Sequence, residues 1–448
     1  MSSTHDTDLP VAVIGAGPAG LAAAAQLRTR GLAYVVLEAG ETAGAAVREW
    51  SHVRLFSPWS ELIEPHAAEL LDAAGWTSPD PAGYPTGGEW ARDYLEPLAN
   101  ALGDGVRLGT RVVGVAKSQR DRLVDSGRDE ASFAVHVESA AGEEVIEARA
   151  VIDASGTWSG PNPLGADGVP APGERAAADR ISYRIPDLDD EATRARYAGR
   201  HIAVAGTGAS AKGALVALVE LARQAPDTRV SWLVRRADVG EAFAGSGNDE
   251  LIERGALGRR AQQAATSPVV TTVNTFRTSS ITHAADGTLT LGSSDGQVVE
   301  GVDEVIALTG FRPDLSMLSE IRLDLDPVLQ APRELAPMID PNVHSCGTVE
   351  PHGAAVLAHP ETGFYLVGMK SYGRATSFLS LTGYEQSRSV VAEISGDRES
   401  AARVELTLPD TGVCGGAGTF DATETGGGCC GAPEPELVTL GSAPGSAK

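Results

Sequence analysis

The segment Leu9-Pro-Val-Ala-Val-Ile-Gly-Ala-Gly-Pro-Ala-Gly20 decides the fold of this chain. Its apolar run, residues 9–14, is typical of a buried strand, and residues 21–30 are good helix formers. In such a Gly-x-Gly-x-x-Gly turn, the glycines permit the tight turn, a close approach of the backbone to a pyrophosphate, and close packing of helix on strand. The pattern predicts a dinucleotide site formed by Gly15, Gly17, Pro18, Ala19 and Gly20.

An acidic residue ends the next predicted strand, residues 34–37. Glu38 stands at the spacing where a carboxylate accepts hydrogen bonds from an adenosine ribose, and the same charge would repel a 2′-phosphate. The N-terminus of the preceding helix favours the negative charge of a pyrophosphate. The first site is therefore predicted to bind FAD or NAD and not NADP.

The same order of elements restarts at residue 201. A strand over 201–205 is followed by the turn Gly206-Thr-Gly-Ala-Ser-Ala211, a helix over 212–223 and a strand over 229–234. This last strand ends in two cations suited to a 2′-phosphate, which predicts NADPH. The predicted contacts are Gly206, Gly208, Ala209, Ser210, Ala211, Arg235 and Arg236. The alternative is that the two arginines only cap a surface strand, since alanine replaces the third glycine.

Further predicted strands complete two doubly wound units; they cover residues 148–152, 304–308 and 363–367. We expect an α/β fold with two doubly wound Rossmann-like dinucleotide-binding domains, the NADPH domain being inserted in the FAD domain. The expected parts are 1–165 and 335–397 for the FAD domain, 166–334 for the NADPH domain, and 398–448 for a flexible tail.

The charge balance restricts the partners. The 448 residues include 36 Lys and Arg against 60 Asp and Glu, a formal net charge of -24. Such a surface repels phosphate backbones and anionic lipid headgroups, so neither nucleic acid nor a membrane is expected as a partner. The apolar stretches are too short to cross a bilayer, and a cytoplasmic enzyme is expected. The oligomeric state is left open, a homodimer included.

Together these motifs resemble the flavin-containing monooxygenases and related FAD/NAD(P)-binding oxidoreductases, over most of residues 9–397. In that resemblance Asp153-Ala-Ser-Gly-Thr-Trp158 looks like the crossover that leaves the FAD domain, and Ala307-Leu-Thr-Gly-Phe-Arg-Pro313 looks like the returning one. The resemblance implies cofactor contacts at Ser155, Gly156 and Gly310.

A narrower resemblance points to the flavoprotein monooxygenases encoded in bacterial arsenic-resistance operons. It rests on Trp50-Ser-His-Val-Arg-Leu-Phe-Ser-Pro-Trp59, Tyr84-Pro-Thr-Gly87, Gly368-Met-Lys-Ser-Tyr-Gly-Arg374 and Thr382-Gly-Tyr-Glu-Gln386. It implies FAD, NADPH and a small-molecule substrate, with trivalent arsenic species as candidates.

The same resemblance supplies further site residues. Arg48, Trp50 and Gly368 are implied cofactor contacts. Arg54, Lys370 and Arg374 are candidates to stabilise negative charge on the reduced flavin, helped by a helix that we expect to start near Gly373. The alternative is that all three cations are structural or surface residues.

Two departures from the known patterns keep three functions open. Residues 178–186 lack the Phe-x-Gly-x-x-x-His signature of flavin monooxygenases, and neither core domain contains the cysteine pair of flavin disulfide reductases. We therefore consider an NADPH-dependent monooxygenase-like enzyme first, an NADPH-driven metalloid or thiol reductase second, and a non-catalytic flavin redox or metalloid sensor third.

Cysteines are concentrated near the end of the chain. Cys414, Cys429 and Cys430 stand on Gly-rich sequence that could fold three thiolates around a soft ion such as trivalent arsenic. The alternative is three incidental cysteines on a solvated tail. The residues His344, Cys346, His352 and His359 lack a recognisable ligand spacing, so a structural or flavin-side loop is expected there rather than a metal site.

Overall fold

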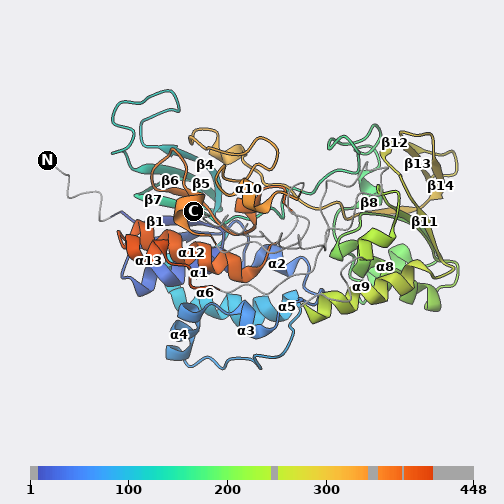
Figure 1. The fold of residues 1–448 in the computed structure, drawn as a ribbon, viewed down its shortest axis with the longest axis horizontal. Coiled ribbons are helices and arrows are strands. Elements are labelled where there is room, and N and C mark those ends of the chain that lie inside the picture. Colours follow the sequence, from blue (N-terminus) through green and yellow to red (C-terminus); the bar gives the residue numbers. More distant parts are fainter. Residues whose placement is uncertain (1–8, 244–250, 342–351, 376–377, 407–448) are drawn as a thin grey trace, which may run out of the picture.

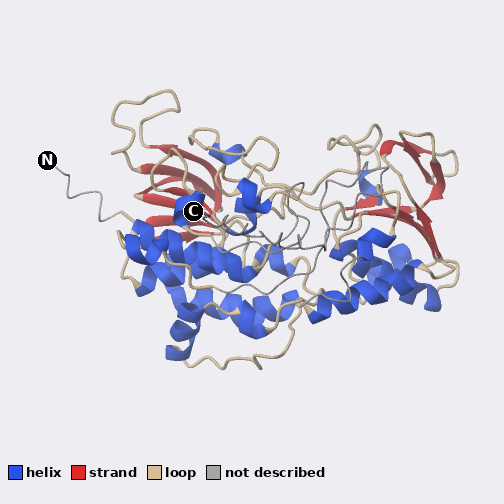
Figure 2. Ribbon diagram, in the orientation of Figure 1, coloured by secondary structure: helices blue, strands red, loops and turns tan. Residues whose placement is uncertain are grey.

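The computed structural model describes residues 9–243, 251–341, 352–375 and 378–406. Figure 1 shows two lobes side by side: the larger one contains both ends of the described chain, in blue and orange, and the smaller one its middle, in green and yellow. In Figure 2 most of the helices lie on one side of the strands in each lobe. This arrangement places one dinucleotide-binding unit inside the sequence of the other.

The first lobe is built on a parallel five-stranded sheet with the order β16-β7-β1-β2-β3. The central strands are short and apolar, and both of their faces are covered, as in sheets flanked by other layers. The strands are β1 Val11–Ile14, β2 Tyr34–Leu37, β3 Val106–Arg107, β7 Ala150–Asp153 and β16 Phe364–Leu366.

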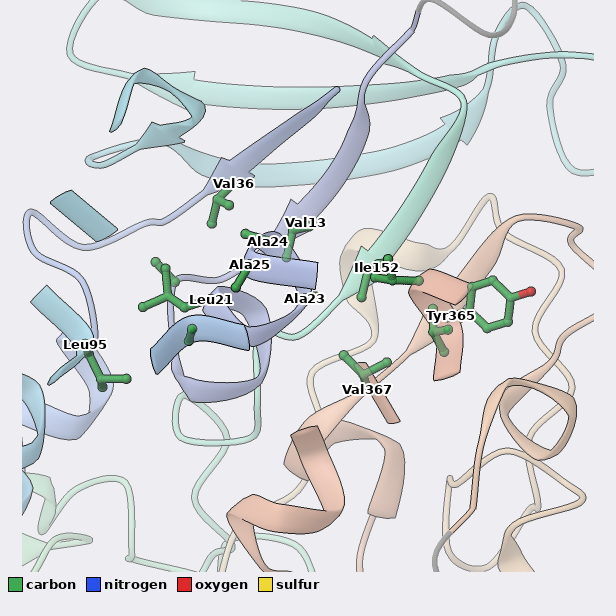
Figure 3. Packing of buried hydrophobic residues seen from close by; sticks show 14 of the residues in the cluster. Val13, Leu21, Ala23, Ala24, Ala25, Val36, Leu95, Ile152, Tyr365 and Val367 are labelled. Carbon is green, nitrogen blue, oxygen red and sulfur yellow. The ribbon is translucent and has the colours of Figure 1, made fainter. Parts of the chain in front are cut away.

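Helix α1 (Pro18–Thr29) fills the centre of this lobe. Its run of alanines favours helix and permits close packing, and residues 20–27 are all buried. Figure 3 shows Leu21 and the alanines of α1 facing Val13, Val36 and Ile152 of the sheet. The helix is thereby held directly behind the turn that follows β1.

Other elements cover the sheet on both sides. An antiparallel three-stranded sheet packs its alternate apolar side chains against one face; its strands are β4 Arg111–Lys117, β5 Phe133–Ser139 and β6 Gly142–Ala148. The remaining helices of this lobe are α2 Ala45–Arg48, α3 Trp59–Leu62, α4 Pro65–Ala73, α5 Gly87–Trp90, α6 Glu96–Leu102, α10 Ala336–Ile339, α11 Ala354–Leu357, α12 Ser380–Ile394 and α13 Arg398–Ala402. The sequence patterns did not predict β4, β5 or β6.

The second lobe repeats the plan with the parallel order β11-β10-β9-β15-β8. Its core surrounds Trp232, which is fully buried between this sheet and α8. The parallel strands are β8 Ile181–Ser182, β9 His201–Ala205, β10 Arg229–Leu233, β11 Val270–Val273 and β15 Glu304–Ala307. The helices are α7 Glu191–Tyr197, α8 Ala209–Gln224 and α9 Ile252–Ala265, and an antiparallel sheet consists of β12 Thr278–His283, β13 Leu289–Ser293 and β14 Val298–Val302.

The chain returns from the second lobe to the first before residue 334, where the sequence predicted the boundary between the two domains. Leu318 and Ile321 are buried in the core that contains β1, β5 and β16. Leu329 and Ala331 belong to the other core cluster of the first lobe. The segment after the second crossover therefore packs with the FAD-type unit, because its apolar side chains find their partners there.

Two expectations near the C-terminus are also corrected. No helix starts at Gly373: residues 368–372 form a 3-10 turn that ends at this glycine, whose φ is 57°, and α12 begins at Ser380. The packed chain continues past residue 398, since Ser400 and Ala401 of α13 are buried and Arg388 donates to the carbonyl oxygens of Ser400 and Arg403. Among the described residues, no helix has the length and apolar character that a bilayer crossing requires.

Candidate functional site

In the first glycine turn, backbone atoms crowd two of the glycines, whereas the third has open space beside it. Gly15 has φ 99°, and a Cβ atom there would lie 2.9 Å from the carbonyl oxygen of Ala154. A Cβ atom on Gly20 would lie 2.0 Å from the carbonyl oxygen of Gly15. A Cβ atom on Gly17, in contrast, would meet no protein atom within 4 Å. The space beside Gly17 is therefore available to a ligand, as a pyrophosphate site requires.

This turn lies where the strand order of the first sheet reverses. β1 pairs with β2 on one side and with β7 on the other, all parallel. In open α/β sheets, ligands bind in the crevice at the carboxyl ends of such strands. Gly15 follows β1 and Ser155 follows β7, so the two predicted contact segments meet at this edge.

Glu38 is fixed at the rim of the same crevice. Its Oε2 accepts a hydrogen bond from the backbone N–H of Ala16 at 2.8 Å, and its Oε1 accepts one from Gly40 at 2.7 Å. Two backbone donors hold a carboxylate in one orientation while lone pairs remain for a ligand. The arrangement fits the predicted contact with a ribose.

Lys370 makes a contact that the sequence did not indicate. Its ammonium group lies 2.7 Å from Oδ2 of Asp153, and the two side chains are 1% and 0% exposed. It also donates to Oγ of Ser155 at 3.0 Å, and that hydroxyl donates to Oδ1 of Asp153 at 2.6 Å. The charge of Lys370 is thus paired with a buried carboxylate, which is compatible with the alternative that Lys370 is a structural cation.

A polar network anchors the turn at Gly368 against α12. Gly368 donates its N–H to Oε1 of Gln386 at 2.7 Å, and Nε2 of Gln386 donates to Oγ of Ser371 at 2.9 Å. The ring of His352 lies 2.7 Å from the same Gln386 nitrogen. Gln386 and Ser371 are fully buried, so this network fixes the turn next to Ala19 of α1.

The other predicted cations of the first lobe have separate partners. Arg54 is exposed and donates to the carbonyl oxygen of Tyr84, and Arg374 is exposed and donates to Oε1 of Gln330 at 2.9 Å. Arg48 pairs with Glu96 at 2.8 Å. The structure therefore assigns Arg54, Lys370 and Arg374 three different environments, and the proposed roles of these residues stay predictions.

The second glycine turn has the same construction as the first. Gly206 has φ 122°, and a Cβ atom there would lie 2.2 Å from the carbonyl oxygen of Leu308. Gly208 has open space where its Cβ would be, as Gly17 has. Ala211 stands at the third position and is buried, so its methyl group is accommodated. β9 pairs with β10 and β15, and the strand order reverses here too.

Three arginines gather beyond the end of β10. Partial desolvation, and then the positive charges of Arg236 and Arg277, lower the pKa of Arg235, which still remains charged. Arg235 is exposed, whereas Arg236 is 7% exposed. The sequence predicted the first two arginines but not Arg277, because Arg277 lies on the connection from β11 to β12, far away along the chain.

A cavity of about 180 Å³ lies at the junction of the two lobes. Its walls are mostly aromatic and aliphatic and come from both lobes and both crossovers. The lining residues are Trp50, Val53, Trp158, Tyr183, Arg184, Ile185, Ser210, Leu308 and Phe311. Trp158 and Phe311 stack with ring centroids 4.8 Å apart, so the two crossover segments are in direct contact.

Arg184 and Glu49 tie this junction together. The guanidinium carbon of Arg184 lies 4.1 Å from the ring centroid of Trp158, and its NH2 donates to the carbonyl oxygen of Trp158 at 2.6 Å. The indole Nε1–H of Trp158 donates to Oε2 of Glu49 at 2.7 Å, and Arg184 lies 3.6 Å from the same oxygen. The first lobe supplies Glu49 and the second supplies Arg184, so the contact joins the lobes.

Within the described ranges, no group of three or more His, Cys, Asp or Glu side chains could hold a metal ion. His359 accepts a hydrogen bond from the N–H of Asp324, and burial lowers its pKa to about 4. The predicted metal ligands Cys414, Cys429 and Cys430, as well as His344 and Cys346, lie outside the described residues.

Comparison with known proteins identifies the architecture. Residues 12–345 match the family described as pyridine nucleotide-disulphide oxidoreductase. The bacillithiol disulfide reductase of Bacillus cereus is 19% identical, with a TM-score of 0.62 over 87% of this chain and 99% of that one. A search of curated proteins gave no match.

Two monooxygenases share the same architecture. The cadaverine monooxygenase of desferrioxamine biosynthesis from Erwinia amylovora, solved with FAD, is 13% identical, with a TM-score of 0.60 over 90% of this chain and 98% of that one. The flavin-containing monooxygenase of Stenotrophomonas maltophilia is 24% identical, with a TM-score of 0.53 over 87% and 98%. At such identities these likenesses establish the fold.

Proposed function

Because this chain belongs to the pyridine nucleotide-disulphide oxidoreductase family, we propose that it is an NADPH-dependent FAD oxidoreductase of the monooxygenase type. FAD in the first turn would accept hydride from NADPH and pass two electrons to dioxygen. With one substrate and one proton, the products are NADP⁺, water and the oxygenated substrate. The observation that carries the proposal is the pair of open turns: Glu38 accepts a hydrogen bond from the first turn, and Arg235, with Arg236 and Arg277 nearby, follows the strand next to the second turn.

The residues of the chain have defined tasks in this scheme. The open sides of Gly17 and Gly208 admit the two pyrophosphates, and the N-termini of α1 and α8 favour their charge. Glu38 orients the ribose of FAD, and the Arg235, Arg236 and Arg277 guanidinium groups bind the 2′-phosphate of NADPH. The buried Asp153 and Lys370, together with Ser155, hold the end of β7 at the first crevice.

The position of the cysteines favours oxygen over a disulfide as the electron acceptor. Cys346 is the first cysteine in the sequence, so the region that matches the family, residues 12–345, contains none. A flavin disulfide reductase passes electrons through a cysteine pair beside its flavin. An NADPH-driven metalloid or thiol reductase would have to use Cys414, Cys429 and Cys430 instead, and their presence makes it the second candidate.

The choice of nicotinamide cofactor tests the second site. In anaerobic mixing of the FAD-loaded protein with NADPH or NADH, the wild type is expected to be reduced faster by NADPH. Arg235→Glu with Arg236→Glu should lower that preference at least tenfold, since each charge-assisted contact contributes about 1.5 to 3 kcal/mol. The control is Arg223→Glu, a charge reversal in the last turn of α8, which should leave the preference for NADPH unchanged. An unchanged preference in the double variant would refute the assignment.

The fate of the electrons separates the two candidate enzymes. We propose trivalent arsenic species as the small-molecule substrate class of the monooxygenase, on the resemblance to arsenic-operon flavoproteins and the three late cysteines. A monooxygenase should consume dioxygen and NADPH together with methylarsenite and form an oxygenated product. A reductase should oxidise NADPH anaerobically when an oxidised metalloid or a disulfide compound is supplied as electron acceptor, and only while Cys414, Cys429 and Cys430 are intact. Dioxygen consumption that yields only hydrogen peroxide would contradict the oxygenase proposal for this substrate.

A further inference from the structure

Two arginines from distant segments lie close together without a carboxylate between them. Arg312 belongs to the second crossover, and Arg374 follows the turn at Gly368. Partial desolvation, and then the positive charge of Arg374, lower the pKa of Arg312. In the part of the chain that the structure describes, neither guanidinium group forms an ion pair. A chain with 60 Asp and Glu residues could easily have supplied a partner, so the unpaired charges need an explanation.

Contacts with the first crossover bring the two segments together. The backbone N–H of Arg312 donates to the carbonyl oxygen of Gly160 at 2.8 Å, and a Cβ atom on Gly160 would lie 2.3 Å from the carbonyl oxygen of Arg312. Lys370, in the turn just before Arg374, donates to Oγ of Ser155 at 3.0 Å. Both arginines are therefore attached to the same short stretch of chain that follows β7.

Neutral acceptors hold each guanidinium group by one edge. Nε of Arg312 donates to Oδ1 of Asn162 at 2.8 Å, and its Nη2 donates to the carbonyl oxygen of Gly168 at 3.0 Å. Nε of Arg374 donates to Oε1 of Gln330 at 2.9 Å. Nη1 of Arg312 and both terminal nitrogens of Arg374 contact no acceptor among the described residues. Three nitrogen donors on two cations are thus available to a ligand.

The acceptor of Arg374 is itself held in an unusual conformation. Gln330 has φ 59°, in the left-handed region that residues other than glycine rarely occupy. Its N–H donates to the carbonyl oxygen of Asp326 at 2.9 Å. The adjoining backbone packs closely on Gly373, where a Cβ atom would lie 2.0 Å from the carbonyl oxygen of Leu329. Strained backbone of this kind is concentrated at binding sites, and here it directs an amide oxygen to the guanidinium group of Arg374.

We propose that Arg312 and Arg374 form a binding site for a tetrahedral oxyanion. Two neighbouring guanidinium groups repel each other, and an anion between them removes the repulsion and accepts charge-assisted hydrogen bonds. Three donors from two side chains match the oxygen atoms of phosphate or arsenate better than the two oxygen atoms of a carboxylate. The site does not depend on the proposed function. If that function is correct, the ligands include the pentavalent arsenic oxyanion that oxygenation of a trivalent arsenic substrate produces.

Calorimetric titration of the FAD-loaded full chain with arsenate and with phosphate tests the site. Saturation with 2′,5′-ADP beforehand occupies the arginine cluster of the second dinucleotide fold. The wild type is expected to bind both oxyanions, and to bind acetate more weakly. Arg312→Gln and Arg374→Gln should each weaken both oxyanions at least about tenfold, because each removes a charge-assisted contact. Arg333→Gln is the matched control, since Arg333 is an exposed arginine that pairs with Asp324 at 2.7 Å. It should change neither affinity.

Two further variants separate a lost site from a damaged fold. Arg374→Lys keeps the charge without the guanidinium fork, so its affinity for arsenate should lie between those of the wild type and Arg374→Gln. Gln330→Gly removes the acceptor of Arg374 and relaxes the left-handed backbone, so it should weaken arsenate without lowering the melting temperature.

Three outcomes would overturn the proposal. The first is a wild type that binds neither arsenate nor phosphate. The second is equal binding by the wild type and both glutamine variants, which means an adventitious ion only. The third is acetate that binds as tightly as arsenate, which contradicts a tetrahedral ligand. Arg235 and Arg236 are intact in all these variants, so a failure of 2′,5′-ADP to bind would count against the proposed use of NADPH and not against this site.

Discussion

At the scale of single residues, the glycines of the two turns divide into two kinds. Gly15, Gly20 and Gly206 cannot carry a Cβ atom without a clash with backbone oxygen at 2.0–2.9 Å. Gly17 and Gly208 have no protein neighbour within 4 Å of that position, and both have negative φ. The fold requires glycine at the three crowded positions. A bound ligand would require glycine at the two open positions.

This difference predicts separate effects for two similar substitutions. Gly17→Ala should leave the melting temperature of the flavin-free protein unchanged but reduce its FAD content severalfold, because the methyl group occupies the pyrophosphate space. Gly20→Ala should instead destabilise the protein without any ligand, because its Cβ would lie 2.0 Å from the Gly15 oxygen. Thermal melts with and without FAD, together with flavin absorbance, measure both effects.

A glycine elsewhere in a helix serves as the control. Gly213 of α8 also has open space at its Cβ position. Gly213→Ala should stabilise the protein by about 0.5 to 1 kcal/mol, the usual gain for alanine within a helix, and should alter neither cofactor. If Gly17→Ala behaved like Gly213→Ala and kept its flavin, the space beside Gly17 would not be the pyrophosphate site.

The sequence predicted local site features better than contacts between distant segments. The two glycine turns could be located because their spacing is a property of a few consecutive residues, and Glu38 and Arg235 follow from the length of one strand. The partnership of Lys370 with Asp153 and the approach of Arg277 to Arg235 join segments that are far apart in sequence. The spacing of residues along the chain does not indicate such contacts, so the Lys370–Asp153 pair and the position of Arg277 were not predicted.

At the scale of elements, seven of the ten strands of the two parallel sheets were predicted, whereas β3, β8, β11 and the antiparallel sheets were not. The parallel strands are short apolar runs next to glycine turns, which is a strong local pattern. In β5 the buried side chains alternate with more exposed ones, and β6 is mostly exposed, so both lack a continuous apolar run. The helix expected near Gly373 was misplaced because the positive φ of this glycine ends a turn that the sequence does not distinguish from a helix start.

One buried ion pair holds the connection between β4 and β5 in place. Arg128 and Glu361 are 3% and 1% exposed and lie 2.6 Å apart, and Arg128 also donates to the carbonyl oxygens of Asp121 and Glu320. Arg128→Met would leave the Glu361 carboxylate buried without its partner, at a cost of about 3 to 5 kcal/mol. The loss should be measurable as a lower midpoint in urea unfolding.

An exposed ion pair of the same lobe provides the comparison. Arg107 pairs with Glu144 on the surface, and solvent weakens such pairs. Arg107→Met should therefore hardly change the unfolding midpoint. If the Arg128 and Arg107 variants were equally stable, the buried pair would not be what holds the β4–β5 connection.

At the scale of the whole molecule, each lobe has its own core. The two core clusters of the second lobe contain only residues between Leu164 and Leu308. The clusters of the first lobe contain residues before Ala154 and after Pro313. The insertion of one unit into the other was predictable, because the dinucleotide motifs restart within the sequence. The point at which the chain returns to the first lobe was not predictable, because it depends on which core buries Leu318 and Ile321.

Separate cores predict that the second lobe folds on its own. A fragment of residues 161–312 should unfold cooperatively and bind 2′,5′-ADP with an affinity within about threefold of the full chain, since all its core partners lie within it. Circular dichroism melts and calorimetry check this. A fragment that shows no cooperative transition would mean that the lobes stabilise each other through the Glu49 and Arg184 junction.

The position of β16 at the edge of the first sheet has a consequence for synthesis on the ribosome. This strand pairs with β7, yet it is translated after the whole second lobe. The first lobe therefore cannot complete its sheet, and one side of β7 stays unpaired, until the second lobe has been translated. The order of folding during translation is then the reverse of the order of the motifs in the gene, and a chaperone that shields nascent chains would act on the N-terminal part for the longest time.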